Sequence, residues 1–216
     1  MNKCFIITGF INGNIKNIAH ISKEDYIICA DGGYRFAIRE GIEPDLLIGD
    51  FDSFTEGPPD HVHTITHPIE KDDTDTMLCI KYAVEKGVHE ICLIGGMGGR
   101  LDHTLSNLQS MAWATEFWHS RHMKGRTIRM LDCQNEVMML KNDTLQLSGT
   151  PGEKISLISY SDACMNVTAK SLKWKLTNAH LTNSFPLGIS NEFLTDQCEI
   201  SVGNGCLLIL RSKDLG

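Results

Sequence analysis

The sequence predicts an α/β protein with two domains: a Rossmann-like, mainly parallel sheet with helices, followed by an antiparallel β-sandwich. In the first 125 residues, short apolar runs alternate with helix-like segments, as in βαβ units. From about Arg126, short apolar runs follow one another between turn signals, which is typical of a sandwich. We therefore expect domains at residues 1–125 and 126–216, with the boundary near Gly125.

The expected elements of the first domain are short apolar strands and longer amphipathic helices. Strands are expected at residues 3–8, 26–30, 46–48, 62–66 and 91–94. Helices are expected at residues 34–40, 74–86 and 101–120, with Gly87 ending the second helix. The second helix has an expected core face of Met77, Ile80 and Val84. The third helix has an expected core face of Leu101, Leu105, Leu108, Ala112 and Thr115.

The second domain is expected to contain only strands. They are predicted at residues 127–131, 137–140, 144–147, 154–160, 171–176, 198–202 and 206–210.

Composition limits the classes of function. A content of 42% hydrophobic and 22% charged residues is ordinary for a soluble globular protein. The net charge of -7 argues against a general nucleic-acid surface. An acidic protein that handles phosphates must neutralise them locally, with a metal and a few cationic side chains, whereas a cationic substrate is attracted to it.

The eight cysteines contain no Cys-x-x-Cys motif, so neither a zinc site of that type nor a redox pair is indicated. Most lie inside apolar runs, where a thiol behaves as a small hydrophobe and suits a reducing compartment. No apolar run approaches membrane-spanning length, and the first apolar run is too short for a signal peptide. We expect a cytoplasmic protein without a membrane or nucleic-acid partner.

Two carboxylates, Asp50 and Asp52, follow the predicted strand at 46–48, which Gly49 ends. If the backbone stays extended, side chains at this spacing point to the same side. Two acids at the end of a buried strand can hold Mg²⁺, which prefers oxygen ligands and also binds phosphates. The alternative is a polar turn whose aspartates bond their own backbone.

Acidic residues follow two further strands. Asp31, Gly32 and Gly33 precede a helix with Arg35 in its first turn, where glycines allow close backbone approach and a helix start attracts anions. A simple aspartate cap is the alternative. The segment at 71–76 places three aspartates beside a lysine, which exceeds what helix capping needs and favours a ligand role.

A glycine loop follows the strand at 91–94. Four glycines within residues 95–99 are more than a turn requires, and such loops let phosphates approach backbone amides. The loop matches neither Gly-x-Gly-x-x-Gly nor a P-loop. Arg100 can fork onto phosphate oxygens, and Asp102 with His103 can face the same loop. His103 is equally explained as a cap or surface residue.

All four acidic points lie where a strand ends. In open α/β sheets, the ligand crevice lies at the carboxyl ends of the strands. Chance turns have no reason to gather there with a lysine, an arginine and a glycine loop. The residues therefore indicate a magnesium-dependent enzyme that acts on a nucleotide or polyphosphate.

These motifs resemble, in order, those of the thiamine pyrophosphokinase family. The first four are Ala-Asp-Gly-Gly at 30–33, Asp-Leu-Leu-Ile-Gly-Asp-Phe-Asp-Ser at 45–53, Lys-Asp-Asp-Thr-Asp at 71–75 and Gly-Gly-Arg-Leu-Asp-His at 98–103. The last two are Leu-Lys-Trp-Lys-Leu-Thr-Asn at 172–178 and Gly-Ile-Ser-Asn-Glu-Phe at 188–193. The resemblance thus spans both expected domains.

The resemblance implies that a pyrophosphoryl group moves from ATP to the hydroxyl of thiamine, giving thiamine diphosphate and AMP. It implies Mg²⁺ as cofactor, ATP bound by the first domain, and a homodimer with thiamine bound by the β-sandwich domain at the subunit interface. A positively charged ligand such as thiamine suits an aromatic face and an acidic surround.

The resemblance also implies roles for particular residues. The metal ligands are Asp50, Asp52 and Asp75, and Asp31 with Asp102 completes the acidic catalytic set. The thiamine-binding residues are Trp174, which stacks on thiamine, and Ser190 and Asn191, which contact its pyrimidine ring. Asp102 or Asp72 takes the proton of the hydroxyl. The ATP-binding residues are Gly32, Gly33, Arg35, Ser53, Lys71, Asp72, Gly98, Gly99, Arg100 and His103.

Two departures from the family pattern and two alternative functions remain. The segment from Thr8 to Gly13 is bulkier than the small glycine turn of the family, and Ser171 replaces a glycine before the tryptophan motif. A related pyrophosphokinase acting on another small alcohol would share the ATP site but not the thiamine residues. A non-catalytic nucleotide-binding module would be expected to lack a metal carboxylate, and all three are present.

Overall fold

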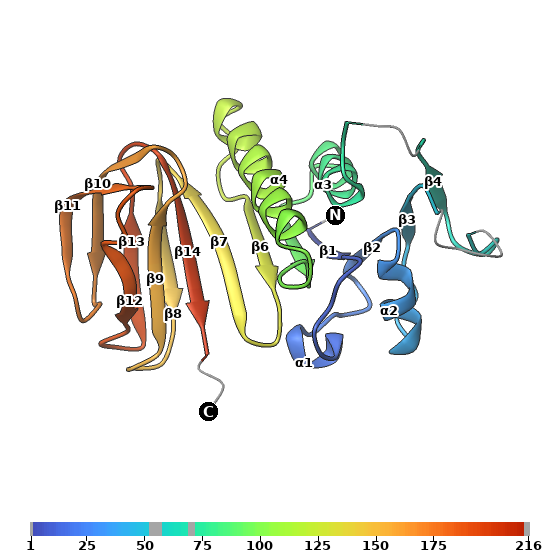
Figure 1. The fold of residues 1–216 in the computed structure, drawn as a ribbon, viewed down its shortest axis with the longest axis horizontal. Helices are drawn as coiled ribbons and strands as arrows, with labels where there is room; N and C mark the ends of the chain where they lie inside the picture. Colours follow the sequence, from blue (N-terminus) through green and yellow to red (C-terminus); the bar gives the residue numbers. More distant parts are fainter. Residues whose placement is uncertain (1, 52–57, 69–71, 214–216) are drawn as a thin grey trace. The chain divides into compact units, whose positions relative to one another are not determined.

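The computed structural model describes residues 2–51, 58–68 and 72–213, which form two compact units that divide between Cys133 and Gln134 (Figure 1). The expected strand at 127–131 is present as β6 (Thr127–Leu131), but it pairs in parallel with a strand of the first unit. Parallel pairing places β6 in the first sheet, so its assignment to the antiparallel half was wrong.

The first unit is built on a parallel sheet in the order β6-β5-β1-β2-β3-β4, and every described pairing in it is parallel. Its other strands are β1 (Lys3–Ile7), β2 (Tyr26–Ala30), β3 (Leu46–Gly49), β4 (Thr64–Thr66) and β5 (Glu90–Ile94). The expected strands are thereby confirmed. β1, β2, β3 and β5 read as nearly continuous apolar runs because helices cover both faces of the sheet.

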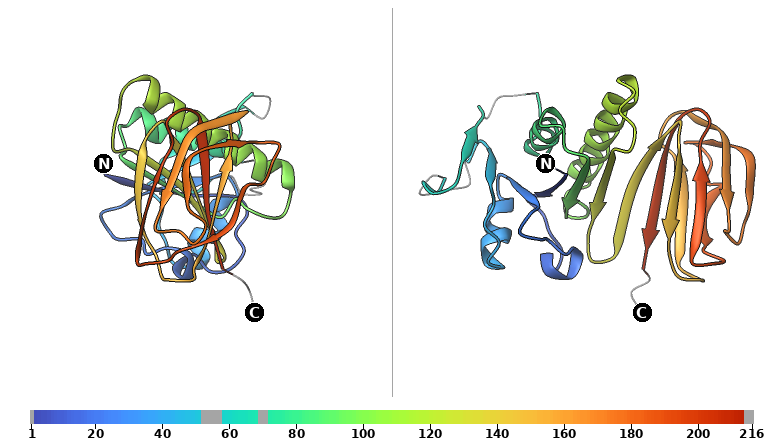
Figure 2. Two further views of the ribbon diagram at one scale, coloured as in Figure 1. Left: turned by 90° about the vertical axis from the view of Figure 1, so that its left-hand side faces the viewer. Right: turned by 180° about the vertical axis from the view of Figure 1, so that it is seen from behind.

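Four helices cover this sheet: α1 (Ile15–Ile18), α2 (Gly33–Arg39), α3 (Asp75–Glu85) and α4 (Leu101–Ser120). Figure 2 shows α1 and α2 on one face and α3 and α4 on the other. Ile15 and Ala37 pack with Phe5, Ile7 and other sheet residues in one core cluster, which agrees with this arrangement. The three expected helices are confirmed, whereas the single turn of α1 is too short to show a periodic pattern.

The core face expected for α4 was wrong. Leu101 and Leu105 are 71% and 54% exposed. The residues buried instead are Asn107, Ser110, Met111, Ala114 and Trp118. Two of these are polar, and both satisfy carbonyl groups: Asn107 Nδ2 bonds Gly96 O at 2.9 Å, and Ser110 Oγ bonds Ser106 O at 2.9 Å. The buried face of α4 therefore combines polar with apolar side chains.

The second unit consists of two antiparallel sheets, in the orders β12-β9-β14-β7 and β11-β10-β13-β8. Side chains from both sheets, including Ile155, Leu207, Val167 and Ile200, form one core, so the expected sandwich is confirmed. Its strands are β7 (Asn135–Lys141), β8 (Thr144–Ser148), β9 (Lys154–Ser159), β10 (Ala163–Lys170), β11 (Leu176–Thr182), β12 (Gly188–Glu192), β13 (Gln197–Ser201) and β14 (Cys206–Ser212).

One expected strand of this unit was wrong, and three were missed. Residues 171–175 form the connection between β10 and β11 instead of a strand. β11 and β12 escaped detection because they are rich in polar residues, and β10 because polar residues interrupt its apolar ones. Register shifts also interrupt the pairing of β10 with β11 and of β12 with β9, which breaks the simple alternation of side chains.

All eight cysteines are free thiols, and only Cys133 is exposed. Burial raises the pKa of the Cys92 thiol to about 11, which keeps it protonated and inert. The expected role as small hydrophobic residues is thus supported, and the cytoplasmic location stays a prediction. None of the described helices has the length and apolar character of a membrane span.

Adjacent glycines at the start of α2 provide a test of how closely helix and sheet approach. A Cβ on Gly33 would lie 2.1 Å from Ile7 O, whereas a Cβ on Gly32 would meet nothing within 4 Å. We expect Gly33→Ala to lower the free energy of unfolding by about 3 kcal/mol or more, because backbone atoms must shift. Gly32→Ala, at a helical φ of -56°, should change it by less than about 1 kcal/mol. Denaturant unfolding of both variants measures this, and equal losses would contradict it.

Candidate active site at the carboxyl ends of the parallel strands

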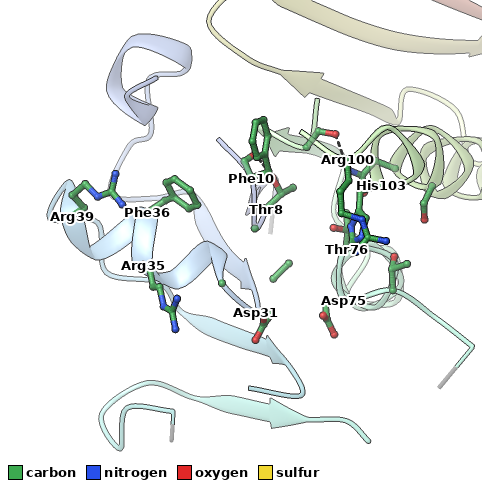
Figure 3. Close-up of a pocket in the computed structure, with 17 residues that line it drawn as sticks. Thr8, Phe10, Asp31, Arg35, Phe36, Arg39, Asp75, Thr76, Arg100 and His103 are labelled. Carbon is green, nitrogen blue, oxygen red and sulfur yellow. Dashed lines mark hydrogen bonds between the residues drawn. The ribbon is translucent and has the colours of Figure 1, made fainter. Parts of the chain in front are cut away.

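A cavity of about 750 Å³ lies in the first unit at the carboxyl ends of β1, β2 and β5 (Figure 3). The strand ends are aligned because their pairing continues past the last strand residue: Thr8 N bonds Ile94 O at 3.1 Å, and Asp31 N bonds Ile48 O at 2.8 Å. The start of α2, the start of α3, the glycine loop and the first turns of α4 complete its walls. Residues from three of the four expected segments, namely Asp31, Asp75 and Arg100, therefore line one space.

Asp31 and Asp75 supply the acidic part of the cavity wall (Figure 3). Asp31 has a positive φ of 39°, and a Cβ on Gly49 would come within 2.9 Å of the Asp31 Cβ. Gly49 is therefore required for Asp31 to sit beside the end of β3. Asp75 is the first residue of α3, but Thr74 caps this helix by accepting the Met77 N–H at 3.3 Å. Thr74, and not Asp75, therefore fills the capping role at this helix start.

The other aspartates expected at the site lie elsewhere. Asp50 directly follows β3 and is half-buried, but it does not line this cavity. Asp72 is exposed and also outside the lining. Asp73 binds Lys81 Nζ at 2.7 Å, so one acid of this cluster has a structural role. Asp52, together with Ser53 and Lys71, lies outside the described residues.

Arginines supply the basic part of the wall. Arg35 and Arg39 both come from α2, one helical turn apart, and Arg100 comes from the loop before α4 (Figure 3). The Arg39 guanidinium lies over the Phe36 ring at 5.2 Å. The sequence analysis did not identify Arg39, although its spacing of four from Arg35 on a helix was a usable signal.

The glycine loop packs closely against Phe10, which also lines the cavity. Cβ atoms on Gly98 and Gly99 would lie 3.1 and 2.9 Å from the Phe10 ring. Gly96 N donates to Phe10 O at 2.8 Å, and Asn107 Nδ2 holds the Gly96 carbonyl. Part of the glycine content of the loop is therefore required by its close packing against the bulky segment at 8–13. The sequence analysis attributed this glycine content to a phosphate cradle.

Several loop amides already have partners within the protein. Gly95 N donates to Leu131 O at 2.8 Å, and Gly98 N donates to Thr104 Oγ1 at 3.2 Å. With Gly96 N bound to Phe10, these three groups are engaged in holding the loop. A cradle of backbone N–H groups for phosphates stays a prediction for the remainder of the loop.

Arg100 forks onto Asp102, with Nη2 to Oδ2 at 2.6 Å and Nε to Oδ1 at 3.1 Å. The hydrogen bonds from Arg100 hold the pKa of Asp102 below its usual range, and the same pair raises the pKa of Arg100. Asp102 Oδ1 also accepts the His103 N–H at 3.0 Å. Both side chains of the pair are exposed, and a phosphate can occupy the same fork because it offers oxygens in similar geometry.

The residues expected to bind thiamine lie in the second unit. Trp174 is exposed in the connection between β10 and β11. Asn191 of β12 is buried, and its side-chain amide forms hydrogen bonds with the backbone of Trp174. Ser190 has a positive φ of 59°, and its N–H donates to Ser156 Oγ at 3.0 Å. The structure therefore brings Trp174 and Asn191 together within one unit.

Carboxylate oxygens are the donors that Mg²⁺ prefers, so Asp31 and Asp75 suit such an ion. Within residues 2–51, 58–68 and 72–213, no three metal-binding side chains gather closely enough to form a site. The expected ligand Asp52 lies outside those residues. The donor chemistry of the cavity thus fits a hard cation.

The predicted site residues fall into four groups. Those lining the cavity are Asp31, Gly32, Arg35, Asp75, Arg100 and His103. Those of the first unit outside its lining are Gly33, Asp50, Asp72, Gly98, Gly99 and Asp102. Those of the second unit are Trp174, Ser190 and Asn191, and those not described are Asp52, Ser53 and Lys71. Lining residues that the sequence analysis missed include Thr8, Phe10, Phe36, Arg39 and Asn107.

A parallel α/β unit with a charged cavity at its strand ends, followed by a β-sandwich, is the architecture of a two-domain α/β enzyme. Residues 19–121 match the family model for the thiamin pyrophosphokinase catalytic domain, and residues 142–207 match its vitamin B1 binding domain. Thiamine pyrophosphokinase of Bacillus subtilis (strain 168) is 32% identical over 197 residues, which cover 87% of each chain. The chain belongs to the thiamine pyrophosphokinase family, a family of enzymes.

Solved structures agree with this assignment. The crystal structure of thiamine pyrophosphokinase from Bacillus subtilis matches with a TM-score of 0.82 at 28% identity, covering 99% of this chain and 100% of that one. The structure from Geobacillus thermodenitrificans matches with a TM-score of 0.82 at 25% identity, covering 99% of each chain. The similarity therefore extends over both units of the chain.

The pairing of Arg100 with Asp102 predicts a pH effect. The pKa of Asp102 is lower in the folded protein than in the unfolded chain. The ionised carboxylate therefore stabilises the fold above the unfolded-state pKa, and this stabilisation is lost as the pH falls through the folded-state pKa. Arg100→Ala should return the pKa of Asp102 to the ordinary carboxyl range. Carboxyl-carbon NMR titration measures this shift. Arg39→Ala, which removes an arginine that is not bonded to Asp102, should leave the pKa unchanged; a shift of the same size would contradict the assignment.

Proposed function

We propose that this chain transfers the pyrophosphoryl group of ATP to the hydroxyl of thiamine, giving thiamine diphosphate and AMP, with Mg²⁺ as cofactor. Family membership supports the reaction. The observation that carries the proposal is the cavity at the strand ends, where two carboxylates and three arginines line one space. This combination suits a metal-bound polyphosphate in a protein whose net charge is -7.

Each charged group has a proposed task. Asp50, Asp52 and Asp75 would hold the metal ion, which neutralises phosphate charge when bound, and Asp31 with Asp102 completes the acidic set. Arg35, Arg39 and Arg100 bind phosphate oxygens, because guanidinium groups match phosphate geometry and stay charged. Ser53, Lys71 and the remaining glycine-loop amides are assigned to the ATP side by the family motifs.

The chemistry requires alignment and charge neutralisation more than covalent participation of the protein. The thiamine hydroxyl oxygen forms a bond to the β-phosphorus of ATP, and the bond from that phosphorus to the α,β-bridging oxygen breaks, so AMP leaves. The hydroxyl proton passes to a carboxylate, Asp102 or Asp72. The hydrogen bonds from the Arg100 guanidinium lower the basicity of Asp102. If Arg100 binds a phosphate instead, the basicity of Asp102 rises again.

Trp174, Ser190 and Asn191 form the proposed thiamine side of the site. A positively charged ring such as that of thiamine stacks favourably on an indole face. We further propose a homodimer with thiamine at the subunit interface. Large apolar side chains at and beside β12, namely Phe185, Leu187 and Ile189, are exposed, and a subunit interface there would bury them.

The reaction is tested by incubating the purified protein with ATP, Mg²⁺ and thiamine and separating the products by chromatography. We expect AMP and thiamine diphosphate in equal amounts, and neither product after chelation of the metal. Formation of AMP with another small alcohol but not with thiamine would indicate a related pyrophosphokinase. Binding of ATP without turnover of any alcohol would indicate a nucleotide-binding module.

Asp75→Asn tests the acidic part of the cavity. Loss of one carboxylate should lower kcat by about 100-fold or more, because a preorganised charge in a catalytic site contributes at least that much. Asp73→Asn is the matched control: its carboxylate is two residues away, binds Lys81, and does not line the cavity. Steady-state kinetics and thermal unfolding of both variants separate activity from stability. Equal kcat values for the two variants would remove Asp75 from the site.

A further inference from the structure

The segment that carries Trp174 is bound through backbone contacts to the last residue of β12 and to the residues that follow it. Lys173 N donates to Glu192 O at 2.9 Å, and Leu194 N donates to Ser171 O at 2.9 Å. Leu172 is buried and forms a β-bridge with Phe193. These contacts anchor the backbone before Trp174, so the connection between β10 and β11 has a defined path up to that residue.

One side chain continues this anchoring at Trp174 itself. Asn191 Oδ1 accepts the Trp174 N–H at 3.0 Å, and Asn191 Nδ2 donates to Trp174 O at 2.7 Å. Both backbone polar groups of Trp174 are therefore bound by one amide. The same Oδ1 also accepts the Glu192 N–H at 2.9 Å.

The amide of Asn191 is almost fully used by these bonds. An amide offers two acceptor positions and two donor hydrogens, and here both acceptor positions and one hydrogen serve the backbone. Asn191 is only 3% exposed, whereas Trp174 is 53% exposed. The amide of Asn191 is thus buried and the indole of Trp174 is exposed. This is the arrangement expected if Asn191 positions Trp174.

Charged neighbours distinguish the two faces of the indole ring. Lys173 Nζ lies 4.7 Å from the ring centroid of Trp174, and Glu192 Oε2 holds the same Nζ at 2.9 Å. Glu192 Oε1 also binds Lys154 Nζ at 2.6 Å, and these lysines hold the pKa of Glu192 below its usual range. A second cation is repelled by the ammonium group, so the ring face away from Lys173 is the better one for a positively charged ligand.

We propose that Asn191 is a positioning residue, which fixes the backbone of Trp174 so that the indole presents the face away from Lys173 to a cationic ring. This assignment rests on the proposed function, because it takes thiamine as the ligand of Trp174. It differs from direct recognition of the pyrimidine by Asn191, which the family motif implies. Fixing the indole before binding reduces the conformational entropy lost when the ligand stacks.

A double-mutant cycle separates positioning from direct contact. We expect Asn191→Ala to raise the Kd for thiamine about tenfold, as for the loss of two ordinary hydrogen bonds. If Asn191 acts through the indole, it should cost less than about twofold further in a Trp174→Ala background. Independent contact with the ligand would give the full loss in both backgrounds and would overturn the proposal.

Kinetic controls exclude a general loss of structure. Asn191→Ala should raise KM for thiamine while leaving KM for ATP and kcat at saturating thiamine within about twofold. Asn183→Ala, at an exposed amide of the same unit, should change none of these values. Asn191→Asp keeps the acceptor for both N–H groups but sets an oxygen against Trp174 O, and should reproduce the defect. A full rescue by aspartate would contradict the role of the Nδ2 bond.

A spectroscopic measurement tests the positioning role without any substrate. The chain has three tryptophans, so 5-fluorotryptophan labelling gives three ¹⁹F resonances, and Trp174→Phe assigns one of them. Asn191→Ala should shift or broaden the Trp174 resonance and leave those of Trp113 and Trp118 unchanged. An unchanged Trp174 resonance would overturn the proposal even if thiamine is turned over. A changed resonance in a protein inactive on thiamine would preserve the positioning role and reject the ligand.

Discussion

The close approach of backbone segments at the carboxyl ends of the parallel strands is the constraint on which the candidate site depends. A Cβ at residue 33 would overlap Ile7 O, and a Cβ at residue 49 would crowd Asp31. Only glycine fits at either position without a shift of the backbone. Because α2 starts directly against β1 and β3 ends directly against Asp31, the carboxylate and the arginines of α2 reach the same cavity.

The charges of the cavity follow from this placement. Neighbouring groups neutralise one another: Arg100 binds Asp102, Asp73 binds Lys81, and Thr74 takes the capping role that an aspartate would otherwise fill. Lys81 and Asp73 thus pair outside the cavity lining, whereas Arg100 both lines the cavity and binds Asp102. The second unit follows the same principle, since buried Asn191 and the Glu192 ion pairs hold the segment from which Trp174 projects.

Much of the fold could be predicted because the parallel strands are continuous apolar runs and α3 carries clear start and stop signals. The motifs also identified six residues of the cavity wall. The buried face of α4 could not be predicted, because Asn107 and Ser110 are polar residues, which hydrophobicity patterns place on the exposed face. Both are buried because their side chains bond carbonyl groups, and the partner of Asn107, Gly96, lies outside the helix. Phe10 escaped attention because its contact with Gly98 and Gly99 joins segments about ninety residues apart.

The sequence by itself determined the class of fold and the residue types of the site, since apolar periodicity and the order of motifs are local properties of the chain. The tertiary structure decided which of those residues share a space. Parallel pairing assigned β6 to the first unit, and long-range packing turned part of the glycine loop into a surface for Phe10. The folded structure also places the Asn191 amide where it forms hydrogen bonds with the backbone of Trp174. Hydrogen bonds and close contacts between distant segments leave no periodic signal, and for that reason only the folded chain shows them.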